Sequence, residues 1–199
     1  DAATALSEMI QWFLDSGGAQ TGRMARHLKQ AELPLEWQQE RPGGFAGRPG
    51  LGGVIGGRMF GVPFGSTDAT TLRALIAETG AQALRVTPWR MLFLEEASAA
   101  DLPGILSEWQ PVMEVSACPG APFCPQATVH TRDLARELSQ MVSGTLHVSG
   151  CDKGCARPAA SALTLVGREG RFDLVQNGKA GDTPVQTGLT AADLRVLEV

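Results

Sequence analysis

Four cysteines constrain the fold of this chain more than any other feature of its sequence. All of them lie in one segment, at Cys118, Cys124, Cys151 and Cys155, and no other cysteine occurs. Five residues separate the first two, 26 separate the inner two, and three separate the last two. Disulfide frameworks belong to small, cysteine-dense secreted chains, whereas two close pairs in a longer chain are typical of a metal or cluster site. We therefore expect the fold to bring the two pairs together.

The spacing of the first pair favours an iron–sulfur cluster over a zinc ion. Structural zinc sites use cysteine pairs separated by two to four residues on tight turns, so a five-residue gap is too open. Three prolines and a glycine interrupt residues 118–125, which predicts a stiff loop rather than regular structure. A cluster is bulkier than an ion and tolerates such a loop. Zinc, or a set of buried free cysteines, is the alternative.

Composition limits the other classes of function. The chain has 199 residues, 43% of them hydrophobic, which is enough for a real core. Its net charge of -4 argues against a broadly basic nucleic-acid binder, so any bound anion must meet a local group of basic residues. The first residues lack the basic lead of a signal peptide, and no run approaches the roughly 20 apolar residues of a membrane span. We expect a cytoplasmic chain, and its start at Asp1 suggests a fragment or processed form.

The apolar pattern predicts an α+β protein in three parts. Residues 1–47 form a helical lead-in and linker, with a helix over 1–14, a weaker one over 22–31 and a breaker-rich loop over 41–50. Residues 48–109 hold a strand over 54–62, a helix over 66–79 capped by Ser66 or Thr67 and stopped by Gly80, and strands over 83–87 and 91–94. A short helix is also expected within 98–109, and Pro103 confines its start to a position near Asp101 or Leu102.

Residues 110–199 carry the cysteines. The pattern predicts a strand over 112–115 that leads into Cys118, a helix over 131–142 and a strand over 145–149. Two alternating runs, 162–166 and 172–176, flank a turn and predict a hairpin. Thr190 and Asp193 have the spacing of a capping box, which predicts a terminal helix.

The cysteine motif resembles that of the sulfite and nitrite reductase superfamily. The shared pattern is Cys-x5-Cys followed by Gly-Cys-x3-Cys. Residues 146–156 (LHVSGCDKGCA) and 162–167 (ALTLVG) are most similar to the precorrin-3B synthase family. Residues 61–65 (GVPFG) and 84–90 (LRVTPWR) resemble that family's ferredoxin-like half-domain. These enzymes have two pseudo-symmetric halves, of which this chain matches about the second, so the N-terminal half would be a missing partner.

The resemblance implies a fold, a cofactor and a reaction. The fold would be a ferredoxin-like half-domain followed by a sulfite/nitrite reductase-like [4Fe–4S] α/β domain, with Cys118, Cys124, Cys151 and Cys155 as cluster ligands. In siroheme reductases the last cysteine also bridges to the tetrapyrrole iron, and Cys155 holds that place. A precorrin-3B synthase instead hydroxylates precorrin-3A with O2 and forms a lactone in aerobic cobalamin biosynthesis. It would need an electron donor, NADH or a reductase, and could use a non-haem iron.

Two other functions remain open at this point. A siroheme-dependent sulfite or nitrite reductase would share the cluster, and a non-enzymatic, metal-stabilised binding module would share only the fold. A tetrapyrrole substrate carries many carboxylates, so its pocket needs cations. Arg85, Arg90, Lys153 and Arg157 lie in the matching motifs and are the predicted substrate-binding residues, against the alternative of ordinary solvated charges. His147, among apolar neighbours in a predicted strand, is expected to be a core histidine with satisfied hydrogen bonds.

Overall fold

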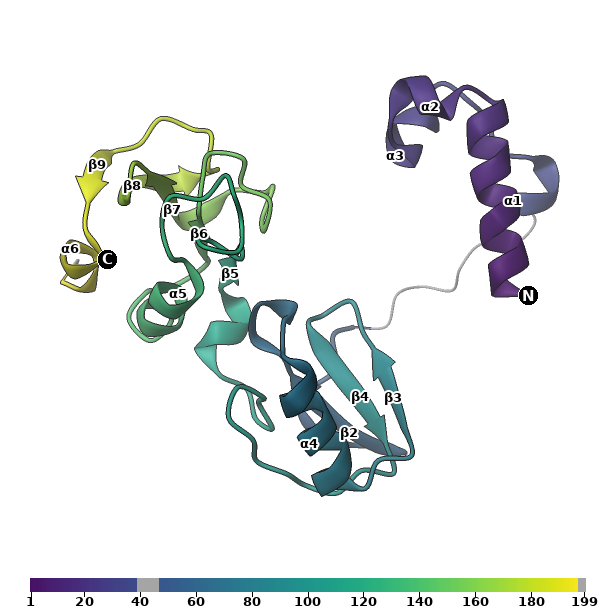
Figure 1. Cartoon of the computed structure of the whole chain (residues 1–199), viewed down its shortest axis with the longest axis horizontal. Coiled ribbons are helices and arrows are strands. Elements are labelled where there is room, and N and C mark those ends of the chain that lie inside the picture. The colour runs from purple at the N-terminus through teal and green to yellow at the C-terminus, as the bar shows by residue number, and fades with distance from the viewer. Residues whose placement is uncertain (39–46, 197–199) are drawn as a thin grey trace. The chain divides into compact units, whose positions relative to one another are not determined.

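The computed structural model describes residues 1–38 and 47–196 (Figure 1). The chain divides into two compact units, residues 1–47 and 48–199. Part of the predicted loop over 41–50 lies outside the described residues. Both helices and sheets are present, so the α+β class is confirmed. Among the described residues, no helix is both long enough and apolar enough to cross a bilayer.

The first unit is helical. Its elements are α1 (Ala2–Asp15), α2 (Gly18–Thr21), α3 (Met24–His27) and the 3-10 turn η1 (Leu35–Trp37). The Asp1 carboxylate caps α1 by accepting from the amides of Ala3 and Thr4, and the predicted first helix is confirmed. The helix predicted over 22–31 is shorter than expected, since only α3 forms there, and the pattern did not predict α2, which ends at Gly22 with φ 75°.

The second unit begins with a four-stranded antiparallel sheet. Its strands are β1 (Gly52–Val54), β2 (Gly57–Gly61), β3 (Ala83–Val86) and β4 (Met91–Glu95), in the order β1-β2-β4-β3. The strand predicted over 54–62 is confirmed only for β2, because Gly56 at φ 81° turns the chain between β1 and β2 and makes a hairpin of them. β2 and β3 both run antiparallel to β4 between them. They are therefore parallel to each other, and with the helix that joins them they form a split β-α-β unit.

That helix, α4 (Ala69–Thr79), covers one face of the sheet (Figure 1). Phe60, Leu75 and Leu94 form the buried centre of this contact. Asp68 caps the helix in place of the predicted Ser66 or Thr67, and Gly80 ends it as predicted. The predicted helix over 98–109 is wrong. Residues 97–110 are irregular, because Pro103 and Gly104 break the run and Leu106 pairs with Gly61 of β2.

The second sheet has five strands in the order β5-β6-β7-β8-β9. They are β5 (Ser116–Ala117), β6 (Leu146–Ser149), β7 (Ser161–Arg168), β8 (Arg171–Gly178) and β9 (Gln186–Leu189). The strand predicted over 112–115 is wrong, because Pro111 opens the 3-10 turn η3 (Pro111–Glu114) and pairing starts only at Ser116. The β7–β8 hairpin is confirmed, and β9 is an element that the apolar pattern did not predict.

Two helices complete this sheet. The helix predicted over 131–142 is shorter than expected, since α5 (Arg132–Leu138) ends in a turn; the terminal helix α6 (Ala191–Arg195) has the predicted capping box. Leu134 and Leu138 of α5 and Leu194 of α6 pack with the Leu146, Val148, Leu163 and Leu165 face of the sheet. Successive strand residues alternate between faces, so His147 and Ser149 lie on the opposite face.

Candidate cluster and substrate site

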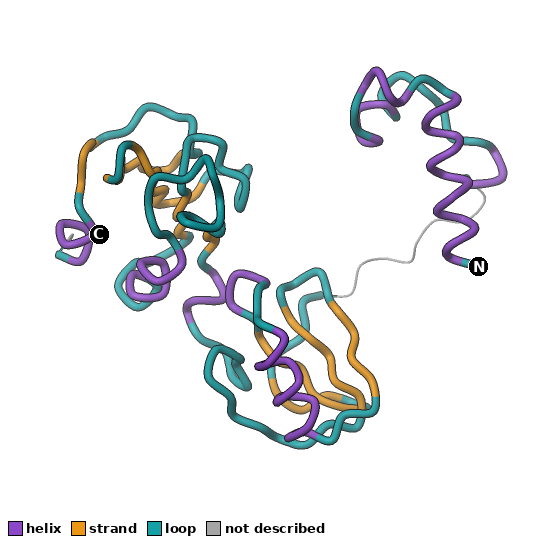
Figure 2. Tube along the Cα trace, in the orientation of Figure 1, coloured by secondary structure: helices purple, strands orange, loops and turns teal. Residues whose placement is uncertain are grey.

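The cysteines lie on two loops that leave the same edge of the second sheet. The first cysteine loop, residues 118–129, follows β5 directly, and the second cysteine loop, residues 150–157, follows β6; both appear as loop in Figure 2. β5 and β6 are adjacent and parallel, so their carboxyl ends share an edge. The Thr128 amide donates to the Gly150 carbonyl at 3.2 Å, which ties the loops together. Sheet topology therefore brings the two cysteine pairs into one region.

Gly150 makes the close approach between the loops possible. Its amide donates to the Cys118 sulfur at 3.1 Å, and a Cβ at this position would lie 2.5 Å from the Ala127 Cβ. Only glycine leaves room for this contact. The Thr131 hydroxyl donates to the Cys118 carbonyl at 2.6 Å and holds the start of the first loop to α5. The thiol of Cys118 is thus buried and oriented before any ligand binds.

By residue type the four cysteines are donors that iron–sulfur clusters use, but among the described residues their thiols are not gathered around one point. All four cysteines are free: Cys118 is buried, Cys124 and Cys151 are half-buried, and Cys155 is exposed. Across the described ranges, no three His, Cys, Asp or Glu side chains converge as they would around a single metal ion. Four thiols on facing loops, one already hydrogen-bonded by a backbone amide, are the donors that Fe–S clusters use. Cys118, Cys124, Cys151 and Cys155 are the residues that would hold it.

A cavity of about 370 Å³, here called the cluster-side cavity, opens beside two of these thiols. Its lining residues are Phe64, Arg90, Ser116, Ala117, Cys118, Pro119, Arg132, Cys155 and Ala156. Phe64 and Arg90 both have a left-handed backbone, with φ of 59° and 58°. Such a conformation is costly for a side-chain-bearing residue and is often retained at functional sites. The segment after β2 and the β3–β4 turn thus each contribute one residue with a strained backbone to the cavity wall.

The side chain of Arg90 donates two hydrogen bonds to backbone carbonyls. Its guanidinium donates to the Val115 carbonyl at 2.5 Å and to the Met113 carbonyl, and so links the β3–β4 turn to the approach of β5. Burial lowers the pKa of Arg90, with the neighbouring charges Arg48 and Arg157 adding to the effect and Glu114 opposing it. Arg90 lines the cavity, but these bonds make it a clamp between the two sheets.

The other predicted cations lie in different surroundings. Arg85 is exposed on β3 and pairs with Glu95 at 2.5 Å, outside the cluster-side cavity. Lys153 is exposed between Cys151 and Cys155. Arg157 is half-buried, and its Nε donates to the Ala160 carbonyl at 3.3 Å. The structure therefore brings Lys153 and Arg157 to the second cysteine loop, with Arg90 on the adjoining cavity, and leaves Arg85 apart. A substrate contact by any of them stays a prediction.

His147 differs from the satisfied core histidine that the sequence suggested. Its side chain is fully buried, and among the residues described neither ring nitrogen has a hydrogen-bond partner. Burial, with the charge of Arg157 adding to its effect, lowers the pKa of His147 from 6.5 to about 4. A Cβ added at Gly154 would lie 3.6 Å from its Cε1. A neutral, unpartnered imidazole therefore lies under the second cysteine loop.

Sequence reasoning missed Arg132 and Arg136. Arg132 lines the cluster-side cavity, and both arginines lie over the ring of Phe64. The available signal was their four-residue spacing at the start of the helix that follows the first cysteine loop, which places both on one helix face.

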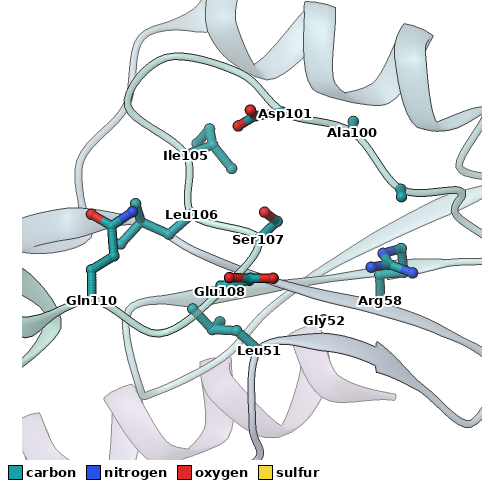
Figure 3. A pocket seen from close by; sticks show the side chains of 11 residues that line it. Leu51, Gly52, Arg58, Ala100, Asp101, Ile105, Leu106, Ser107, Glu108 and Gln110 are labelled. Carbon is teal, nitrogen blue, oxygen red and sulfur yellow. The ribbon is translucent and has the colours of Figure 1, made fainter.

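A larger cavity has a volume of about 830 Å³. Figure 3 shows the side chains that line it. Arg58, Glu108 and Asp101 are among the residues around it, and its lining contains none of the cysteines and none of the predicted cations. Volume alone does not identify a reactive site. The smaller cavity is the better candidate, because it combines thiols, arginines and strained backbone.

The chain is similar in sequence to two curated enzymes. No family model matches the chain. One relative belongs to the class of nitrite reductases: the ferredoxin–nitrite reductase of Leptolyngbya laminosa is 30% identical over 114 residues, covering 47% of this chain and 21% of the relative. A second is the precorrin-3B synthase of a Sinorhizobium species, 32% identical over 143 residues, covering 62% of this chain and 31% of the relative. The resemblance seen in the cysteine motif is confirmed, and the similar proteins are enzymes.

Two further facts define the extent of the similarity. Among solved structures, the NirA protein of Mycobacterium tuberculosis matches 63% of this chain and 30% of its own, with 21% identity and a TM-score of 0.42. The chain spans about a third or less of the length of the curated relatives that it matches.

Proposed function

We propose that this chain is the cluster-binding part of a precorrin-3B synthase that acts in the cytoplasm. The similarity to the Sinorhizobium enzyme carries the proposal, because it covers 62% of the chain. The arrangement of the four cysteines on one sheet edge supports it. Because the chain spans only 31% of that relative, we also propose that residues outside it complete the substrate site.

The proposed reaction is a monooxygenation. One atom of O2 enters the meso carbon between rings A and D of precorrin-3A as a hydroxyl group, and the ring A acetate closes a lactone. The other oxygen atom leaves as water. NADH, directly or through a reductase, supplies two electrons and one proton for this step, and solvent supplies the second proton. A [4Fe–4S] cluster bound by Cys118, Cys124, Cys151 and Cys155 would supply one-electron transfer at this place.

The residues of this chain would bind the cluster and orient the macrocycle, and none of them would react chemically with the substrate. The Gly150 amide, 3.1 Å from the Cys118 sulfur, would stabilise the thiolate form of that ligand. Arg90 would keep the cavity wall in place through its two carbonyl contacts. Phe64 and the backbone of the first cysteine loop would keep water from the reacting edge of the macrocycle.

A nitrite or sulfite reductase with a siroheme is the second candidate. The similarity to the Leptolyngbya nitrite reductase favours it, as does the position of Cys155 on the cluster-side cavity. The two functions differ in what happens to the tetrapyrrole. A reductase retains an iron tetrapyrrole as its catalyst, whereas a synthase releases its tetrapyrrole as product.

The deciding experiment is anaerobic purification of the whole enzyme followed by absorption spectroscopy and assay. We expect iron, acid-labile sulfide and a broad cluster absorption without haem-type bands, then conversion of precorrin-3A when O2 and a reductant are added. A stoichiometric siroheme spectrum with nitrite or sulfite reduction would replace the proposal by the second candidate. Zinc in place of iron and sulfide would exclude both enzymes and leave a metal-stabilised binding module.

A further inference from the structure

Two arginines on consecutive turns of α5 lie over the same aromatic ring, that of Phe64. The guanidinium of Arg132 lies 6.0 Å from the centre of the Phe64 ring, and that of Arg136 lies 5.2 Å from it. Phe64 belongs to η2 (Pro63–Gly65) and has the strained backbone described above. An aromatic ring beside a guanidinium orients it without using its N–H donors. The ring therefore orients both guanidinium groups and leaves their N–H donors available for a ligand.

Arg132 lies on the wall between two cavities. One is the cluster-side cavity, and the other, here called the arginine cavity, has a volume of about 490 Å³. The arginine cavity is lined by Ser66, Thr67, Asp68, Thr71, Pro103, Gly104, Pro119, Phe123, Arg132 and Arg136. Pro119 and Arg132 line both cavities, so a ligand in one borders on the other. Positive charge therefore adjoins the region of Cys118 and Cys155.

Protein groups do not satisfy these arginines. In the described part of the chain, neither takes part in an ion pair, and the buried Nε of Arg132 has no hydrogen-bond partner. Asp68 is the one carboxylate on the lining of the arginine cavity, and its two oxygens accept from the amide and hydroxyl of Thr71. A buried donor without an acceptor is costly, so an acceptor from a ligand would relieve that cost.

The surroundings indicate the chemistry of that ligand. Phe123, 81% exposed, lies on the same lining as the arginines and offers an apolar surface. The site thus combines two guanidinium groups with two phenyl rings in a chain whose net charge is -4. A flat apolar molecule with carboxylates on its rim would match this combination, because arginine binds carboxylates through two parallel hydrogen bonds.

We propose that Arg132 and Arg136 bind a rim carboxylate of an anionic tetrapyrrole, with Phe64 and Phe123 against its apolar part. The inference rests on the proposed function and adds the residues that select the substrate. It also separates their role from that of Arg90, whose guanidinium donates to two backbone carbonyls, and from that of Arg85, which is paired with Glu95. Arg132 and Arg136 are thus the cations available to the ligand at this cavity.

The test measures binding of a stable probe, the octacarboxylate uroporphyrin III, to the whole enzyme by equilibrium dialysis. The variants are Arg132→Gln and Arg136→Gln. A third variant, Arg132→Lys, keeps the positive charge but cannot donate two parallel hydrogen bonds to one carboxylate. Arg73→Gln is the matched control, since it removes the same charge from an exposed position on α4 that lines neither cavity. Circular dichroism of each variant verifies that it folds.

We expect Arg132→Gln to weaken uroporphyrin binding about 10- to 100-fold, the loss of one charge-assisted hydrogen-bond pair. Arg136→Gln should weaken it less, Arg132→Lys should recover part of the loss, and Arg73→Gln should change it less than twofold. A porphyrin bearing N-methylpyridinium cations should gain, not lose, affinity in the two glutamine variants. Equal binding of uroporphyrin by wild type and folded variants would overturn this inference alone. Failure of the wild-type enzyme to bind any carboxylated tetrapyrrole would overturn the proposed function with it.

Discussion

Replacing Gly150 by alanine should separate the two cysteine loops. The new Cβ would lie 2.5 Å from the Ala127 Cβ and 3.4 Å from its Cα, whereas carbon atoms in contact lie about 3.5–4.0 Å apart. Ala127 would have to move by about 1 Å, which strains the 3.2 Å bond from Thr128 to the Gly150 carbonyl. Overpacking costs about 1–3 kcal/mol and the weakened hydrogen bond about 1 kcal/mol. We expect Gly150→Ala to lower the free energy of unfolding by about 2–4 kcal/mol in total.

Urea unfolding followed by circular dichroism measures this loss. The midpoint should fall in Gly150→Ala while the slope of free energy against urea stays unchanged. Gly181→Ala is the matched control: its Cβ would meet only the Asp152 carbonyl, at 3.9 Å, and its backbone φ is not left-handed. The variant should also incorporate less iron, because Gly150 contacts the Cys118 sulfur. A loss below about 0.5 kcal/mol in Gly150→Ala would refute the close-packing argument.

Three further outcomes follow from the described contacts. Because burial lowers the pKa of His147 from 6.5 to about 4, its contribution to stability is complete above pH 6.5 and is lost as the pH falls towards 4. We expect the free energy of unfolding, measured with urea, to fall by about 2 kcal/mol between pH 7 and pH 5 because of His147. If His147→Leu shows the same fall, this explanation is wrong. Asp173→Ala removes a buried carboxylate that accepts from Arg168 Nε at 2.9 Å and from the Gly188 amide at 3.1 Å. The free energy of unfolding should therefore fall by about 2–3 kcal/mol. An unchanged urea midpoint would show that these two hydrogen bonds do not stabilise the fold. Removing iron should speed hydrogen exchange in the two cysteine loops and leave β2 and β4 protected; equal protection of the loops with and without iron would argue against a cluster there.

Local signals accounted for the elements that were predicted correctly. Gly80 ends α4 because glycine adopts the left-handed conformation without strain, and Thr190 with Asp193 opens α6 through contacts within one turn. The errors arose where another segment decides the conformation. Leu106 pairs with Gly61 instead of continuing a helix, and the run over 54–62 folds back on itself so that β2 can pair with β4.

The sequence by itself showed four thiols, divided into two pairs by spacing and flanked by glycine and proline, and from this pattern we predicted a cluster-type motif. That information is local, because ligand type and loop stiffness are properties of the residues themselves. Only the tertiary structure decided which cations are available near the thiols. The sequence did not indicate that the guanidinium of Arg90 donates to the carbonyls of Met113 and Val115, and Arg132 lies at the cavity because α5 packs beside Phe64. The partners of a long charged side chain depend on which segments the fold brings to it, and sequence spacing does not encode them.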